Sequence, residues 1–154
     1  MICVKKNVNL FIKLLALILV FSLVSPIPVG AVSAEKNSTR ASVYLDSYNT
    51  YICAMGGGDL QIWYTVVGDD DMDEIGVLSI ILYESSDKTN WTRVKTYSHE
   101  NYSSMLATDD WIHSSYVPYD GIAGKYYKAY VCIWAGRNGA GDTRYMWTAV
   151  EKAT

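Results

Sequence analysis

The sequence predicts a single all-β domain, a sandwich of about seven antiparallel strands. After Val43 the chain is rich in valine, isoleucine, threonine and aromatic residues, which favour strands. Apolar and polar residues alternate in several segments, and no long stretch shows the apolar spacing of a helix. Turn residues recur about every 8–15 positions, which is typical of sandwiches built from short strands.

The first 34 residues are predicted to be a secretory signal peptide. Lysines precede the apolar run Leu14 to Val24, and small residues follow it from Gly30 to Ala34. This order is typical of exported proteins, and the apolar run is shorter than the ~20 residues of a membrane-spanning helix. We expect cleavage after Ala34, with Ala31 as the alternative, and a secreted, extracellular product. The other interpretation is an uncleaved membrane anchor.

The mature chain is acidic. Removing the three lysines of the signal leaves 10 basic and 16 acidic residues, a formal charge of 10 − 16 = −6. Nucleic acids and anionic membranes need a basic footprint, so neither is an expected partner after signal removal. The oligomeric state is left open. The remaining length of about 120 residues corresponds to one domain, expected over residues 43–154.

The first half of the domain is expected to contain four strands. Polar residues 35–42 are predicted to form a flexible tail, and the first strand is expected over 43–54. Residues 60–67 alternate cleanly, which directs one side of that strand to the core. The nearly continuous apolar run 75–83 predicts a central strand, and a polar turn joins it to the fourth strand at 91–98.

The second half is expected to contain three more strands. A polar connection with a helical turn near 103–107 leads to a strand over 112–119, where Pro118 indicates an edge or a strand end. A strand over 125–135 and a last one over 142–150 follow, joined by a glycine-rich turn. Seven strands at this spacing predict an immunoglobulin-like or fibronectin type III-like sandwich.

Two resemblances meet in the strand over 125–135. The alternating residues from Tyr127 to Ala135 resemble the penultimate strand of fibronectin type III domains, whereas Tyr130-Val131-Cys132 resembles strand F of immunoglobulin domains, with Cys53 in the place of the earlier cysteine. The two imply opposite faces for Cys132. The pattern favours the fibronectin-like alternative, in which three residues face the core and Lys128 faces outward. The three are Ala129, Val131 and Ile133.

The mature chain also resembles an uncharacterised family of small secreted proteins of Gram-positive bacteria. The resemblance rests on residues 72–76, 91–97 and 119–129. It implies secretion and the sandwich fold. It implies no catalytic residue, because the family has no activity that can be transferred.

Two cysteines, Cys53 and Cys132, remain after signal removal. In an exported chain they most simply form one disulfide, which would close a loop of about 80 residues and restrict the unfolded chain. The alternative is two separate thiols. A metal site on these cysteines is not expected, because the chain has no Cys-x-x-Cys spacing and only two histidines.

No enzyme is expected. The sequence contains no Gly-x-Ser-x-Gly elbow, and His99 and His113 lie in or beside predicted loops. Adjacent carboxylates such as Asp109 and Asp110 point apart on an extended chain and so do not face one substrate. A small hydrolase using one of the histidines is the remaining catalytic alternative.

No cofactor is expected, with calcium as the one alternative. Asp69, Asp71 and Asp73 follow the spacing of the first three ligands of an EF-hand loop. Glu74 replaces the required glycine and Ile80 occupies the twelfth position, so the motif is incomplete. The other interpretation is an exposed acidic loop that keeps the protein soluble.

The aromatic residues carry the strongest functional signal. Five tryptophans and thirteen tyrosines exceed what a core of this size hides, and both side chains combine a flat apolar body with a polar tip. The alternation places Trp91, Arg93, Lys95 and Tyr97 on one face. The predicted ligand-binding residues are four rings and two hydrogen-bond donors. The rings are Trp91, Tyr97, Trp63 and Trp134, and the donors are Arg93 and Lys95.

The sequence therefore predicts a secreted, non-catalytic binding module for a carbohydrate or a protein surface. A sugar ring can stack on an exposed aromatic ring, and a protein partner can cover the same strip. The alternative is a structural or cell-envelope-associated interaction protein that acts through self-association. In a third interpretation, the rings only cover the outer faces and edges of the sheets.

Overall fold

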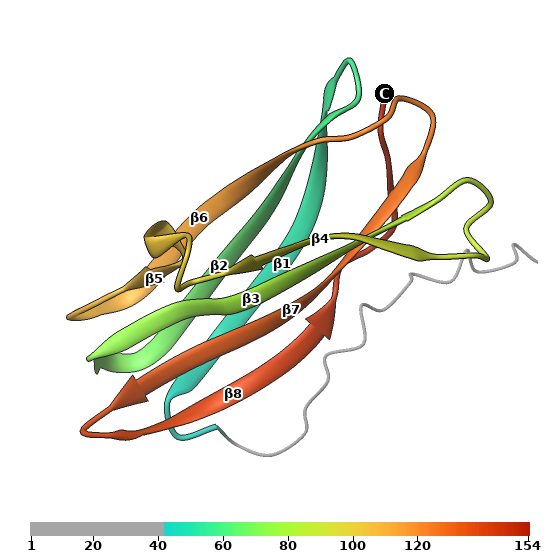
Figure 1. Ribbon diagram of the computed structural model, residues 1–154. Helices are drawn as coiled ribbons and strands as arrows, with labels where there is room; N and C mark the ends of the chain where they lie inside the picture. Colours follow the sequence, from blue (N-terminus) through green and yellow to red (C-terminus); the bar gives the residue numbers. More distant parts are fainter. Residues whose placement is uncertain (1–41) are drawn as a thin grey trace, which may run out of the picture. The chain divides into compact units, whose positions relative to one another are not determined.

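The protein is a sandwich of two antiparallel sheets (Figure 1). The computed structural model describes residues 42–154. The predicted signal peptide, residues 1–34, and residues 35–41 of the predicted tail lie outside this range. Within it, no helix is long and apolar enough to cross a membrane. The prediction of an all-β sandwich is confirmed.

Sheet A contains three strands in the order β1-β2-β6. Their bounds are β1 Leu45–Gly56, β2 Asp59–Met72 and β6 Asp110–Asp120. β6 is an edge strand, as the proline at position 118 indicated.

Sheet B contains four long strands in the order β4-β3-β7-β8 and two short ones, β5 on β3 and β9 on β7. Their bounds are β3 Glu74–Ser85, β4 Thr92–Ser98, β5 Leu106–Ala107, β7 Tyr126–Arg137, β8 Ala140–Trp147 and β9 Glu151–Lys152. A single 3-10 turn, η1 Ser103–Met105, precedes β5. β4 pairs with β3 in sheet B. In immunoglobulin constant domains, by contrast, the fourth strand belongs to the same sheet as the first two strands.

The seven long strands coincide with the predicted ones, and their ends differ. Residues 68–74, expected as an acidic loop, are the end of β2 and the start of β3, and at Asp73 between these two strands the chain passes from sheet A to sheet B. β7 and β8 are joined by Asn138 and Gly139, with φ of 55° and 74°. Such values suit the tight turns that join antiparallel strands.

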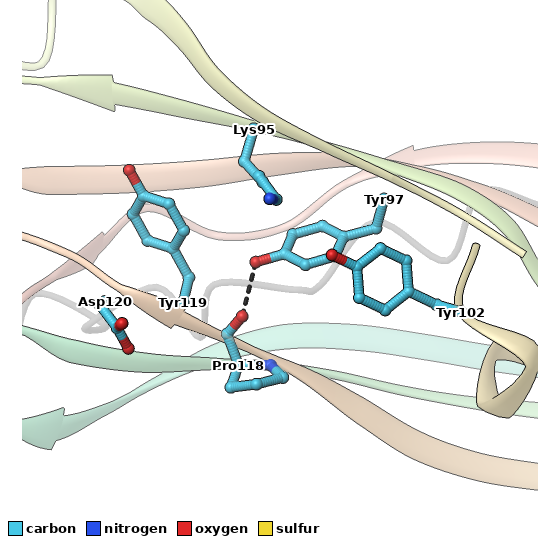
Figure 2. A pocket seen from close by; sticks show the side chains of 6 residues that line it. All are labelled: Lys95, Tyr97, Tyr102, Pro118, Tyr119 and Asp120. Carbon is cyan, nitrogen blue, oxygen red and sulfur yellow. Dashed lines mark hydrogen bonds between the residues drawn. The ribbon is translucent and has the colours of Figure 1, made fainter.

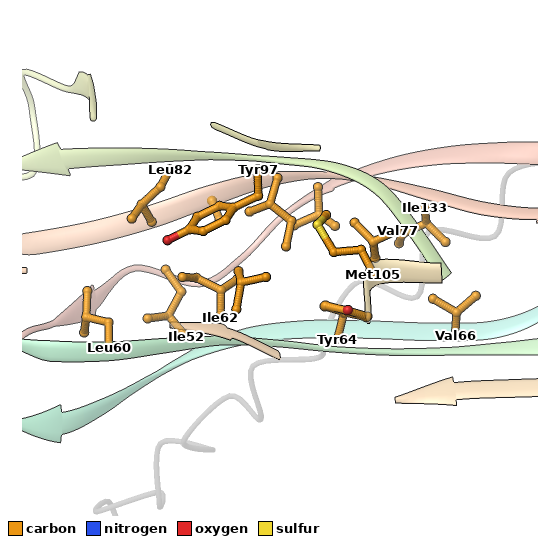
Figure 3. Close-up of a cluster of buried hydrophobic side chains, with 14 of the residues drawn as sticks. Ile52, Leu60, Ile62, Tyr64, Val66, Val77, Leu82, Tyr97, Met105 and Ile133 are labelled. Carbon is orange, nitrogen blue, oxygen red and sulfur yellow. The ribbon is translucent and has the colours of Figure 1, made fainter. Parts of the chain in front are cut away.

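Strand alternation supplies the core (Figure 3). On β2, Leu60, Ile62, Tyr64 and Val66 are at most 1 % exposed, as the alternation predicted. On β7, five alternate residues are completely buried, and they include the three that the fibronectin-like alternative placed inside. The five are Tyr127, Ala129, Val131, Ile133 and Ala135. The fibronectin-like alternative is therefore confirmed.

Tyr127 ties the start of β7 to the preceding turn and to β3. Its ring is completely buried, its hydroxyl donates to Oε2 of Glu84 at 2.7 Å, and it accepts from the amide of Ile122 at 2.9 Å. This is the geometry of a tyrosine corner, in which a tyrosine at the start of strand F bonds backbone a few residues upstream. Burial of the phenol, together with the Glu84 carboxylate, raises the pKa of Tyr127 to about 12.

Gly76 allows the segment of η1 and β5 to approach β3 closely. Its φ is +145°, and a Cβ at this position would collide with the carbonyl oxygen of Met105 and the ring of His113. Met105 is completely buried and belongs to the core. Only glycine therefore suits this position.

The first described residues are fixed to β8. Ser42, predicted as the end of the flexible tail, donates its hydroxyl to Oδ2 of Asp142, and the amide of Val43 donates to the same oxygen at 2.9 Å. These bonds lower the pKa of Asp142, with the Ser42 hydroxyl as the largest cause. Ser42, the last residue of the predicted tail, is thus held against the domain.

Tyr127→Phe is expected to lower the free energy of unfolding by about 1–3 kcal/mol, because the Ile122 amide and the Glu84 carboxylate each lose a partner. Chemical denaturation measures this. The wild type should also lose stability as the pH rises from about 10 to about 12, since the folded state keeps the Tyr127 phenol neutral. The substitution should remove this contribution. Tyr116→Phe, at an exposed ring, should change stability by less than about 0.5 kcal/mol; equal effects of the two would contradict the assignment.

Gly76→Ala is expected to lower the free energy of unfolding by about 1–3 kcal/mol, because the new methyl group displaces the backbone at Met105. Gly139→Ala is the control, since Gly139 also has positive φ but has nothing within 4 Å of its Cβ position. It should lose less stability than Gly76→Ala. A larger loss for Gly139→Ala would show that backbone strain, not the close approach of Met105, determines the effect.

Candidate functional site

The structure distributes the six predicted ligand-binding residues over three places. Trp63 lies on the outer face of sheet A, because Ile62 and Tyr64 on either side of it point inward. Trp91, Arg93 and Trp134 lie on the outer face of sheet B, and Lys95 and Tyr97 line a cleft at the edge of the sandwich. The predicted residues therefore do not form one site.

The prediction that β4 presents Trp91, Arg93, Lys95 and Tyr97 on one face is wrong. Lys95 pairs with Leu82 and Arg93 with the next residue of β3, so Val94 is an extra, bulged residue. A bulge reverses the alternation of a strand. Tyr97 consequently faces the core and is 2 % exposed.

The edge cleft lies between β4 and β6 and has a volume of about 340 Å³. Figure 2 shows its six lining residues, which are Lys95, Tyr97, Tyr102, Pro118, Tyr119 and Asp120. The hydroxyl of Tyr97 donates to the Pro118 carbonyl at 2.6 Å and so joins the two sheets. Burial raises the pKa of Tyr97, which keeps this donor protonated. The volume is at the lower end of the range for small-ligand sites.

An aromatic row crosses the outer face of sheet A. It consists of Tyr51, Trp63 and Tyr116, which are direct cross-strand neighbours on β1, β2 and β6. The ring centroids of Tyr51 and Trp63 are 6.4 Å apart with planes within 8°, and those of Trp63 and Tyr116 are 4.7 Å apart. Tyr51 is 46 % exposed and Tyr116 is 41 % exposed. The row is a continuous ring surface open to solvent.

Polar, uncharged side chains surround the aromatic row. Gln61 Oε1 accepts from the Trp63 indole Nε1 at 3.0 Å and so fixes the orientation of the central ring. On the other side of the row, the hydroxyls of Thr65 and Ser114 lie 2.9 Å apart. Asn49 is exposed opposite Thr65 on β1. Ring faces and hydrogen-bonding groups therefore occur side by side.

A second group of aromatic rings lies on the outer face of sheet B. Tyr83, Tyr130, Tyr145 and Trp147 contact one another with centroids 4.8 to 5.7 Å apart. The Lys128 ammonium lies 4.6 Å from the ring centroid of Trp147 and 4.3 Å from that of Trp91. This face differs from the aromatic row because it carries cations.

Trp134 has a packing role. Its indole lies across Gly136 and Gly141, which are directly paired between β7 and β8, and a Cβ at either glycine would collide with the ring. An aromatic side chain over paired glycines compensates for the side chains that they lack. The Trp134 ring therefore stabilises this end of sheet B.

The carboxylates of the acidic segment 69–74 do not converge on one point. Asp69, Asp71 and Asp73 are all exposed, and Asp73 accepts from the backbone amide of Asn138 at 2.6 Å. Within residues 42–154, no group of three or more His, Cys, Asp or Glu side chains is arranged to hold a metal ion. The geometry thus gives no support to the calcium alternative.

The predicted disulfide is wrong, since Cys53 and Cys132 are free thiols. Cys53 faces outward from sheet A, and Cys132 faces outward from sheet B between the inward residues Val131 and Ile133. The core separates the two sulfur atoms, whereas a disulfide needs Cα atoms within about 7 Å. Burial raises the pKa of Cys132, while hydrogen bonds from Tyr145 and Ser79 lower it less.

The His113 side chain makes structural contacts within the fold. Its Nε2 lies 2.9 Å from the carbonyl oxygen of Ser104, and its ring packs on Tyr64. This contact holds η1 against β6.

Sequence reasoning missed two members of the aromatic row and most of the rings around Lys128. Neighbouring residues of a strand point to opposite faces, so an inward Ile52 would have implied an outward Tyr51 from the sequence. The pairing of Tyr51, Trp63 and Tyr116 was not, because it depends on the register of three strands.

Thiol labelling tests the free cysteines. In native protein without residues 1–34, and hence without Cys3, one thiol should react rapidly with a maleimide when no reductant is present, because Cys53 is exposed and Cys132 is buried. Both should react in denaturant. Mass spectrometry of Cys53→Ser should show slow native labelling only. If the denatured protein contained no free thiol, the two cysteines would form a disulfide and the assignment of free thiols would be wrong.

No protein-family model and no curated protein matches the chain. Among solved structures it is similar to the crystal structure of Spo0M, a sporulation control protein from Bacillus subtilis, with a TM-score of 0.39 and 8 % sequence identity. The similarity covers 71 % of this chain and 49 % of that chain, so this chain spans about half of its length. A likeness at this level carries no functional argument.

Proposed function

We propose that the protein is a secreted, non-catalytic binding module that takes a carbohydrate on the outer face of sheet A. The observation that carries this proposal is the aromatic row, in which Tyr51, Trp63 and Tyr116 are in register across three strands. Export is supported by the signal-like residues 1–34 of the sequence.

The chemistry around the row suits a neutral sugar. Aromatic rings present flat apolar faces on which the C–H faces of a sugar ring can stack, and Tyr51 and Tyr116 add hydroxyls at the rim. Gln61, Thr65 and Ser114 offer both donors and acceptors beside the rings. Such groups can bond sugar hydroxyls without a charge.

The rigidity of the row also favours binding. Trp63 is on the central strand of sheet A, between two paired strands, and its indole N–H is held by Gln61. A ring that is already fixed loses little conformational entropy when a ligand arrives. The row extends across the strands, so a polysaccharide chain can contact all three rings at once.

Self-association through the same face is the second candidate. It is favoured by the exposure of apolar groups in this neutral region: Tyr51, Tyr116 and the Cys53 side chain are all exposed. The mature chain is acidic, so two copies repel each other overall. The aromatic row itself carries no charged side chain, so contact between two rows adds no charge repulsion. Sedimentation velocity over a range of protein concentrations separates the candidates, because only self-association makes the mass depend on concentration.

Trp63→Ala is expected to weaken binding to a neutral polysaccharide by at least about tenfold, because a central tryptophan commonly dominates a binding surface. Affinity electrophoresis and pull-down against a panel of insoluble and soluble neutral polysaccharides measure this, and a glycan array identifies the sugar.

Trp111→Ala is the matched control. Trp111 is also on sheet A and is 54 % exposed, but its position on β6 alternates with that of Tyr116, so it is not in the row. It should leave the affinity unchanged. Binding that persists in Trp63→Ala, or no binding of the wild type to any neutral polysaccharide, would contradict the proposed site.

A further inference from the structure

The basic side chains of the domain divide into two groups. There are eight of them in residues 42–154, namely Lys88, Arg93, Lys95, Lys125, Lys128, Arg137, Arg144 and Lys152. The ion pairs of this range use Lys125 with Glu84, Arg137 with Asp70 and Arg144 with Asp142. Four of the other five lie on the outer face of sheet B.

These four cations and the rings beside them form a basic aromatic patch. Its members are Lys88, Arg93, Lys128, Lys152, Tyr83, Trp91, Tyr126 and Trp147. Strand register builds it: Arg93, Tyr83 and Lys128 are direct neighbours across β4, β3 and β7. Tyr126, two residues before Lys128 on the same face of β7, pairs with Lys152 of β9.

Aromatic rings hold the lysine ammonium groups in place. Lys128 lies between two indoles, 4.3 Å from the Trp91 centroid and 4.6 Å from that of Trp147. Lys88 and Lys152 flank the Tyr126 ring at 4.5 and 5.7 Å. A ring face attracts a cation but accepts no conventional hydrogen bond, so the ammonium donors stay available.

The nearby carboxylates are engaged in other contacts. Asp87 accepts from the amides of Thr89 and Asn90, each at 2.8 Å, and from the hydroxyl of Ser85, which shapes the turn between β3 and β4. Glu151 pairs with the inward Tyr127, so alternation directs it away from the face of Lys152. The patch therefore concentrates positive charge on a chain whose formal charge is −3.

We infer that the basic aromatic patch binds an anionic polysaccharide, whose carboxylate, sulfate or phosphate groups accept hydrogen bonds from Lys128, Lys152 and Arg93. The exposed ring of Trp147 supplies a stacking surface for the sugar units between these groups. Charge complementarity identifies the ligand class, because Lys88, Lys128 and Lys152 have rings and not carboxylates as partners. This site is on the opposite face of the sandwich from the aromatic row, and it does not depend on the proposed function.

A polysaccharide fits better than a nucleic acid. Nucleic acids carry closely spaced phosphates and bind surfaces that are basic over a long track. Here the cations cover one part of one sheet, and carboxylates dominate the rest of the chain. A polymer with widely spaced acidic groups meets the patch without approaching the acidic surfaces.

The test is the double variant Lys128→Gln/Lys152→Gln with five probes: dextran sulfate, polygalacturonate, dextran phosphate, neutral dextran and single-stranded DNA. The wild type should bind at least one anionic probe more tightly than dextran. The double variant should bind that probe about tenfold more weakly, because it loses two charge-assisted contacts. Its affinity should also depend less on salt. The preferred probe identifies the acidic group, and melting temperature checks that the variants fold.

Lys95→Gln/Arg137→Gln is the control, since it removes the same charge from the edge cleft and from the Asp70 pair. It should retain the affinity within about twofold. An equal loss in this control, or equal wild-type affinity for dextran, overturns the inference. Tighter binding of single-stranded DNA than of every anionic polysaccharide also overturns it, in favour of nucleic acid. Trp63→Ala should leave anionic binding intact, so failure of the proposed function is detected separately.

Discussion

The alternation of β7 is the constraint on which the rest of the structure depends. Tyr127, Ala129, Val131, Ile133 and Ala135 are completely buried, and they pack against the inward residues of β2. Once these side chains are inside, strand geometry directs the residues between them outward. Lys128, Tyr130, Cys132 and Trp134 consequently lie on the outer face of sheet B. The burial of one set of side chains thus determines which chemistry the other set presents to solvent.

The two outer faces share an aromatic character and differ in charge. On sheet A the rings stand among amides and hydroxyls, and no lysine or arginine of residues 42–154 lies over them. On sheet B the rings surround Lys128 and flank Lys88 and Lys152. This difference separates a neutral surface from a basic one in a single small domain. The two proposed sites therefore lie on opposite sides of the domain, because the core separates the two faces.

The aromatic rings of this domain have several roles, and their contacts distinguish these roles. Trp134 covers the paired glycines Gly136 and Gly141, so its ring is part of the packing. Tyr97 entered the site prediction as a surface ring, but its hydroxyl bridges β4 to the Pro118 carbonyl of β6. Rings with open faces, such as those of the aromatic row, remain as candidates for ligand contact. A high aromatic content by itself therefore does not locate a site.

The sequence by itself determined the strands, the hairpin turns and the inward sets of β2 and β7, because these follow from local propensity and from a period of two residues. Only the tertiary structure decided which rings meet. The bulge at Val94 moved Tyr97 into the core, and the register of β1, β2 and β6 assembled the aromatic row. It also placed Cys53 and Cys132 on opposite faces. Pairing between strands distant in sequence depends on how the whole core packs, so no local pattern records it.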